Sequence, residues 1–138
     1  MATTTSLFPD FTKEIFFDIE TLRLSHEVEG GWSNIAQFGL AVAVTWDAEK
    51  KFRRWFEPDV KALIAELAQF QRIVSFNGDR FDFEVLRGYH PVDILLGKSF
   101  DLLADLQRRL GFRIKLDDLA RETLGYPKTG NGLEIVQW

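Results

Sequence analysis

The feature that most constrains the fold is a short apolar run interrupted by acidic residues, Glu14-Ile15-Phe16-Phe17-Asp18-Ile19-Glu20. The run is too short for a helix, and its Ile and Phe content favours a β-strand, which we place buried in the centre of a sheet. Because side chains alternate between the faces of a strand, Asp18 and Glu20 project from the same side. A bare Asp-x-Glu is more often a pair of surface acids. Here the apolar context makes unpaired carboxylates costly to bury, which favours a site for a divalent metal.

Apolar periodicity and turn residues divide the rest of the chain into strands and helices. The expected strands are residues 14–20, 35–46, 51–56 and 72–76, and a short extended segment ends near Phe100. The expected helices cover residues 58–70, 81–86, 102–110 and 117–124. Residues 24–34 are expected to form a loop, and residues 47–50 a hairpin turn. Three antiparallel strands, a crossover helix, a fourth strand and further helices describe a mixed α/β sheet.

Composition and charge narrow the class of protein. The 138 residues are 46% hydrophobic and include 13 Phe and 4 Trp, which is typical of one packed globular domain over residues 1–138. Without cysteine, any metal must bind oxygen or imidazole. Residues 1–12 do not resemble a signal peptide and no stretch is long enough to span a bilayer, so we expect a cytoplasmic protein. The net charge of −4 means that a nucleic-acid substrate would need a local basic patch or metal ions.

A third acid, Asp82, lies where a strand gives way to a helix. The expected strand at residues 72–76 is followed by the turn pair Asn77-Gly78, and a helical pattern resumes from Phe81. Asp82 is therefore expected in the first helical turn, where an acid stabilises the positive end of the helix whether or not it binds a metal. Taken alone, Asp82 fits either role.

Together these stretches resemble the motifs of a known family of nucleases. Phe17-Asp18-Ile19-Glu20-Thr21 is similar to the first motif of the DEDD 3′-5′ exonucleases and polymerase B proofreading domains, and Asn77-Gly78 followed by Phe81-Asp82 is similar to the second. Residues 99–103, 116–120 and 124–128 resemble later segments of a bacterial predicted-exonuclease subgroup. The similarity spans nearly the whole chain. It implies a ribonuclease H-like α/β fold, in which three antiparallel strands are followed by parallel strands and the mixed sheet is flanked by helices.

The resemblance also implies a reaction, which is hydrolysis of phosphodiester bonds at single-stranded ends of DNA or RNA with two Mg²⁺ or Mn²⁺ ions. In that family the residue matching Asp18 bridges both ions, the one matching Glu20 binds the water-activating ion, and the one matching Asp82 binds the second ion, mostly through water. The candidate substrate contacts are Thr21, Trp32, Asn77, Phe81, Asp101 and Lys128.

Several of these substrate contacts have an ordinary structural alternative. Trp32 can stack on a terminal base or anchor its loop to the core. Asp101 can line the site or cap the helix that begins near Leu102. Lys128 can face a phosphate or remain solvated. Two basic clusters, residues 50–54 and 108–115, are further candidates for contact with a nucleic-acid backbone, although the first lies on an outer hairpin and fits a solvated face better.

One part of the family pattern is missing from this sequence. DEDD exonucleases carry a fourth Asp near the C-terminus, preceded by a Tyr or His that positions the attacking water. This chain has no Asp after Lys128, and Glu134 fits best as a first-turn acid of a C-terminal helix that is cut short at Trp138. We therefore expect either a fragment of a longer enzyme or a short relative that has lost the chemistry. In the second case the chain is a catalytically silent module that binds nucleic acid or a protein, and an interaction domain with no nucleic-acid role is a third alternative.

Overall fold

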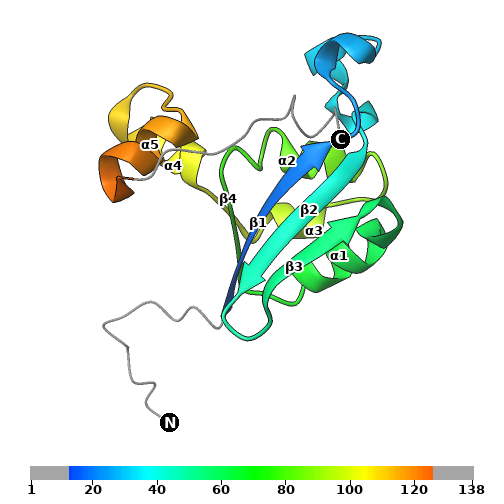
Figure 1. The fold of residues 1–138 in the computed structure, drawn as a ribbon, viewed down its shortest axis with the longest axis horizontal. Coiled ribbons are helices and arrows are strands. Elements are labelled where there is room, and N and C mark those ends of the chain that lie inside the picture. The colour runs from blue at the N-terminus through cyan, green and yellow to red at the C-terminus, as the bar shows by residue number, and fades with distance from the viewer. Residues whose placement is uncertain (1–12, 126–138) are drawn as a thin grey trace.

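The computed structural model describes residues 13–125, and its centre is a five-stranded sheet in the order β3-β2-β1-β4-β5 (Figure 1). The strands are β1 (Glu14–Thr21), β2 (Leu40–Asp47), β3 (Lys51–Phe56), β4 (Arg72–Ser75) and β5 (Ser99–Asp101). β2 pairs antiparallel with both β1 and β3, whereas β4 pairs in parallel with β1 and β5 in parallel with β4. The mixed sheet expected from the sequence, with residues 14–20 at its centre, is confirmed.

Helices connect the strands and follow the last of them. The α-helices are α1 (Val60–Leu67), α2 (Asp82–Arg87), α3 (Asp93–Leu96), α4 (Leu102–Leu110) and α5 (Leu116–Leu124). The 3₁₀ helices are η2 (Ser25–Glu27), η3 (Gly31–Gln37) and η4 (Glu57–Asp59). The expected helices therefore form, although the first is 3₁₀ at its start and ends before Phe70, and α3 was not expected. Within residues 13–125 no helix is long and apolar enough to cross a membrane.

The connection between β1 and β2 differs from the sequence prediction. Residues 24–34, expected as a loop, contain η2 and the start of η3, and β2 begins at Leu40 rather than at Ile35. Ile35 packs against the core and Phe38 is buried, so this segment contributes apolar side chains three residues apart, from a helical turn. A short apolar segment fits helical and strand spacing equally well, which is why the prediction of a strand from residue 35 was wrong.

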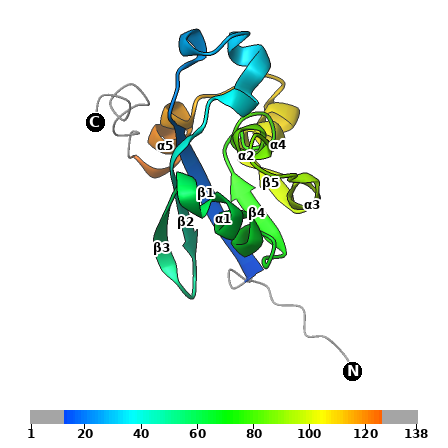
Figure 2. The same cartoon turned by 90° about the vertical axis from the view of Figure 1, so that its right-hand side faces the viewer.

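The two faces of the sheet have different surroundings. Ile15, Phe17 and Ile19 of β1 are buried in the core that α1, α2 and α3 complete on one face (Figure 2). The alternate residues of β1 point to the opposite face, where Asp18 is exposed and Glu20 is half-buried. The prediction that β1 is buried therefore holds for one face only. The argument that burial makes the Asp18 and Glu20 carboxylates costly was wrong.

The hairpin between β2 and β3 is closed by a buried acid. Asp47 Oδ1 accepts hydrogen bonds from the backbone N–H groups of Glu49 (3.1 Å) and Lys50 (2.9 Å), and Oδ2 pairs with Arg53 Nη2 at 3.1 Å. Burial alone would raise the pKa of Asp47, but the backbone hydrogen bonds and the guanidinium together hold it below its ordinary value. The predicted turn at residues 47–50 is thus confirmed.

A close backbone approach holds α2 against η3. A Cβ atom added at Gly88 would lie 2.0 Å from the carbonyl oxygen of Ala36, a distance at which the backbone would have to move. Next to this contact, Tyr89 Oη accepts the backbone N–H of Leu40 at 2.8 Å and donates to Glu57 Oε2 at 2.6 Å. These contacts join the segment after β1 to the helix that begins with Asp82.

Replacing Gly88 with Ala is expected to lower the free energy of unfolding by about 1–3 kcal/mol, the usual cost of overpacking. Gly97 is a matched control, because it ends α3 with nearly the same backbone angles and a Cβ there would meet only ordinary contacts. Gly97→Ala should be neutral or stabilise the fold by up to about 1 kcal/mol. Chemical denaturation of both variants tests this, and equal stabilities would contradict the importance of the Gly88 contact.

Candidate active site

The three predicted acids line a single cavity at the end of β1. Asp18 and Glu20 lie on the open face of β1, and Asp82 is the first residue of α2. The cavity has a volume of about 800 Å³, within the usual range of ligand sites. Its opposite wall includes Arg113 and Lys115, which precede α5, and its floor continues over the apolar side chains of β2. The sequence prediction that these acids come together is therefore supported by their positions around this cavity.

A tight turn delivers Asp82 into the cavity. β4 ends at Ser75, and a Cβ atom at Gly78 would lie only 2.1 Å from Ser75 Oγ. Any residue other than glycine at this position would therefore clash with Ser75. Asn77 has a left-handed backbone with φ of 67°, a conformation that Asn tolerates better than most residues. The N–H of Phe81 then donates to the carbonyl of Asn77 at 3.0 Å. Asn77 and Phe81 both line the cavity, next to Asp82.

Asp101 fixes this turn from the neighbouring strand. Its side chain accepts four backbone hydrogen bonds, from Asn77 (2.8 Å), Asp79 (3.2 Å), Leu103 (2.9 Å) and Ala104 (3.3 Å). The last two cap α4, so the capping role considered for Asp101 is confirmed. Since the carboxylate is buried and fully engaged, Asp101 acts on the site through the turn that it holds.

The electrostatics of the site centre on Asp82. Its side chain is 2% exposed, and Oδ2 has no hydrogen-bond partner among the described residues. Burial raises the pKa of Asp82 well above its ordinary value, and the negative charges of Asp18 and then Asp101 raise it further. Backbone groups of Asp82 and Ile19 offset part of this increase. The buried acid of the site is thus Asp82, which the sequence did not single out as buried.

The donor chemistry of the cavity suits a hard divalent cation, since three carboxylates line it. The unpartnered Oδ2 of Asp82 and the repulsion between Asp82 and Asp18 are what a bound cation would relieve. Over residues 13–125, however, no three His, Cys, Asp or Glu side chains lie in an arrangement that could hold a metal ion. The described residues therefore fit a cation by their chemistry, and they fall short of a complete ligand set.

Of the remaining predicted substrate contacts, neither Trp32 nor Thr21 lines this cavity. Trp32 is 67% exposed, and its ring centroid lies 5.6 Å from that of Phe38 and 6.1 Å from that of Phe81. Trp32 is thus packed against the core on one side and open on the other. Thr21 Oγ donates to the carbonyl of Arg23 at 2.8 Å and does not line the cavity. Lys128 and Glu134 lie outside the described residues.

Sequence reasoning missed two residues of this region. Ser75 lines the cavity with a buried hydroxyl that has no partner among the described residues, and Arg80 lies in the turn that carries Asp82. Arg80 could have been found from its place inside the motif at residues 77–82. Ser75 has no such signal, because its burial depends on how closely Gly78 approaches it. Arg113 and Lys115, named only within a broad basic cluster, are located on the wall of the cavity.

Comparisons with known proteins agree with this architecture. A family model described as the RNase_H superfamily matches residues 15–138. Among solved structures, the fold is similar to that of the family B DNA polymerase from the hyperthermophilic archaeon Pyrobaculum calidifontis, with a TM-score of 0.64 and 14% sequence identity. The match covers 96% of this chain and 21% of the polymerase, so the chain spans about a fifth of that protein's length. No curated protein sequence matches the chain.

Because the pKa of Asp82 is raised by folding, the folded protein binds its proton more tightly than the unfolded chain. The free energy of unfolding must then fall as the pH rises from the pKa of Asp82 in the unfolded chain to its higher pKa in the folded protein. Above the higher pKa the loss is complete. Asp82→Asn is expected to raise the free energy of unfolding at pH 7 without metal, because it removes a buried charge that Asp18 repels.

Thermal denaturation at pH 7 and at acidic pH measures this effect, and the gain should shrink at acidic pH, where Asp82 is protonated in both states. Asp93→Asn is the control, because the Asp93 side chain is 76% exposed. A loss of stability in Asp82→Asn at pH 7 would contradict the electrostatic account of the site.

Proposed function

The chain belongs to the RNase H superfamily, and from this membership we propose that it is a metal-dependent 3′-5′ exonuclease domain of the DEDD type, acting on single-stranded ends of DNA or RNA. The observation that carries the proposal is the shared cavity of Asp18, Glu20 and Asp82, in which the buried Asp82 carboxylate faces the charge of Asp18. Carboxylates at the end of a central strand and at an adjacent helix start are suited to binding cations beside a phosphodiester. We expect the reaction in the cytoplasm, because a chain without cysteine needs no oxidising compartment.

In this proposal Mg²⁺ or Mn²⁺ ions supply two things when bound: they make a water more acidic and neutralise charge at the leaving oxygen. Asp18 would contribute to both ions, Glu20 to the ion beside the attacking water, and Asp82 to the other. β1 holds Asp18 and Glu20 on one rigid strand, so their spacing is set by the sheet. The turn fixed by Asp101 holds Asp82 against them.

The substrate end would lie against the aromatic side of the cavity. Phe81 lines the cavity, and Trp32 stacks beside Phe81 with one face open to solvent. Stacking of a base on an exposed aromatic ring is worth about 1–3 kcal/mol and tolerates any base. We therefore propose Trp32 and Phe81 as the contacts to the terminal base. Asn77, Thr21 and Lys128 remain candidate contacts to the strand, of which Asn77 lies on the cavity wall.

A second candidate function is a catalytically silent module that binds nucleic acid or a protein partner. One observation favours it. Over residues 13–125, no three His, Cys, Asp or Glu side chains lie in an arrangement that could hold a metal ion. Only the exonuclease would cleave a nucleic-acid strand. Stabilisation of the protein by a metal ion would be compatible with both functions.

Cation binding can be measured through stability, because a ligand that binds only the folded state raises the melting temperature. Mn²⁺ is expected to raise the melting temperature of the parent protein. Asp18→Ala should abolish this shift, because it removes the carboxylate whose negative charge acts most strongly on Asp82. Glu49→Gln, an exposed acid on the hairpin, is the control and should keep the shift. No response to Mn²⁺ in the parent protein would count against a metal site.

Cleavage is tested with a single strand labelled at its 5′ end. With Mg²⁺ or Mn²⁺ the strand should shorten stepwise from its 3′ end, and Asp18→Asn should slow this by about 10³-fold, as expected for several kcal/mol of lost metal stabilisation. Asp93→Asn should cleave at the parent rate. A strand that stays intact with the parent protein after long incubation would reject the exonuclease and leave the silent module.

A further inference from the structure

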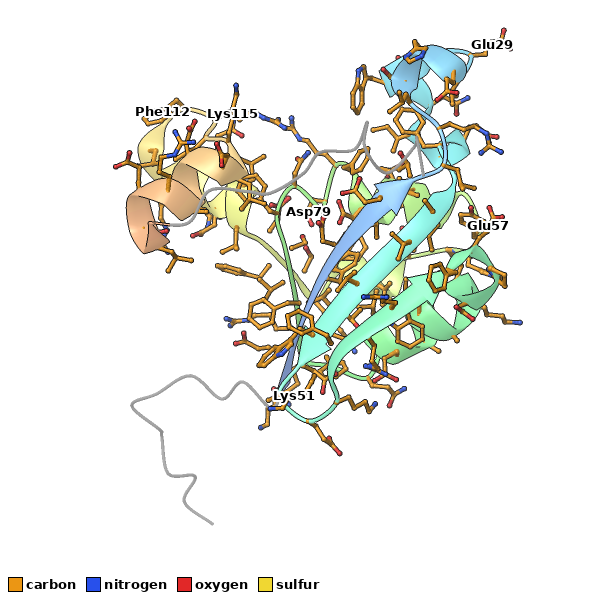
Figure 3. All side chains as sticks on the ribbon, viewed as in Figure 1. Glu29, Lys51, Glu57, Asp79, Phe112 and Lys115 are labelled. Carbon is orange, nitrogen blue, oxygen red and sulfur yellow. The ribbon has the colours of Figure 1, made fainter. Side chains whose placement is uncertain are left out.

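A second cavity adjoins the acidic one on the side away from β1. It has a volume of about 430 Å³ and is bounded by the turn at residues 77–80, the first turns of α4 and the segment before α5. Asn77, Leu103 and Arg113 line both cavities, so the two are neighbours that share a wall. Figure 3 shows Asp79 between the sheet and the α4–α5 region, which carries Phe112 and Lys115. A linear polymer bound at Asp18, Glu20 and Asp82 could therefore extend into the second cavity.

The second cavity carries two arginines whose charge is not used by the fold. Among residues 13–125, Arg80 and Arg113 form no ion pair or side-chain hydrogen bond, and both are exposed. Arg108, which also lines the cavity, is paired with Asp105 at 2.5 Å. The pairing of Arg108 is the usual situation for arginines in this region, since Arg109 and Arg121 also pair with carboxylates. Two free guanidinium groups around one cavity are available for an external anion.

The acids of this cavity cancel only part of that positive charge. Asp101 accepts four backbone hydrogen bonds, so its charge is compensated inside the protein. Asp79 is exposed and accepts a hydrogen bond from Ser99 Oγ at 2.5 Å. The lining residues comprise three Arg and two Asp, a formal charge of +1, beside a cavity lined by three carboxylates. A ligand with anionic groups on both sides of the shared wall would need cations at the acidic side and guanidinium groups at the other.

We propose that this cavity binds the phosphodiester backbone of a single nucleic-acid strand whose end lies at the three acids, and that Arg80 and Arg113 carry the contact. The position of the strand end rests on the proposed function, whereas the binding of backbone phosphates does not. Guanidinium groups bind phosphate through paired N–H donors, and exposed side chains suit a polyanion that is gripped without reading its bases. Because the net charge of −4 gives no general attraction for a nucleic acid, a local cationic patch would favour its binding.

Fluorescence anisotropy with a labelled single strand of about 12 nucleotides, in EDTA to prevent cleavage, measures this binding over a range of salt concentrations. Each phosphate contact contributes about 0.7 to the slope of log K against log salt for single strands. Arg80→Ala and Arg113→Ala should each make the negative slope shallower by about that amount. Each should also weaken binding about threefold or more at low salt. Arg113→Lys should restore the slope. Arg121→Ala, an exposed arginine outside both cavities, should leave it unchanged.

The outcomes separate this proposal from the proposed function. Loss of slope in both arginine variants supports the strand site even if the parent protein shows no cleavage. Parent-like binding by both variants, or no binding by the parent at low salt, overturns the strand site even if cleavage occurs. Displacement of the strand by inorganic phosphate at equal phosphate concentration would show a site for free phosphate and overturn it too. Unchanged melting temperatures of the variants exclude misfolding, since both side chains are exposed.

Discussion

The arrangement of the candidate site depends on one buried carboxylate that binds four backbone N–H groups, that of Asp101. Two of these groups belong to the turn after β4 and two to the start of α4. Leaving such donors buried without an acceptor would cost about 1–3 kcal/mol each, so the carboxylate holds the turn and the helix in one geometry. The turn presents Asp82 to the acidic cavity, and the helix forms a wall of the second cavity. One side chain thus positions elements of both cavities, and it also lines the second of them.

Burial is distributed unevenly among the acids, and this sets what the site can do. Asp18 is exposed on the open face of β1, whereas Asp82 is enclosed and has a raised pKa. An enclosed carboxylate beside a second negative charge opposes folding at neutral pH, and the same enclosure makes it a strong partner for an entering cation. Stability without metal and affinity for metal are therefore in conflict at Asp82. Such a conflict is typical of positions kept for binding rather than for packing.

Much of the fold could be predicted from the sequence, because the signals were local. The apolar run at residues 14–20, the strand at residues 51–56 and the capped helix at residues 102–110 depend on neighbours in the chain. The start of β2 was wrong because Ile35 and Phe38 reach the core from a helical turn, a choice made by tertiary packing. Asp18 and Glu20 lie on a strand and Asp82 in the first turn of a helix, as predicted, but the burial of Asp82 rather than Asp18 depends on which face of the sheet the helices cover. Arg80 and Ser75 were missed because their roles arise from the approach of separate segments.

The two walls of the acidic cavity are anchored to very different extents. The wall with Asp18 and Glu20 belongs to the central strand, whose alternate residues lie in the core, whereas α5, directly after Arg113 and Lys115, contributes no buried residue. Substitutions of the inward-facing residues of β1 disturb the core, and those in the wall beside α5 do not. Over generations the cationic wall can therefore diverge in length, charge and spacing while the acidic wall stays fixed. The same acidic wall can in this way be combined with cavities of different width, and each change is confined to the segment beside α5.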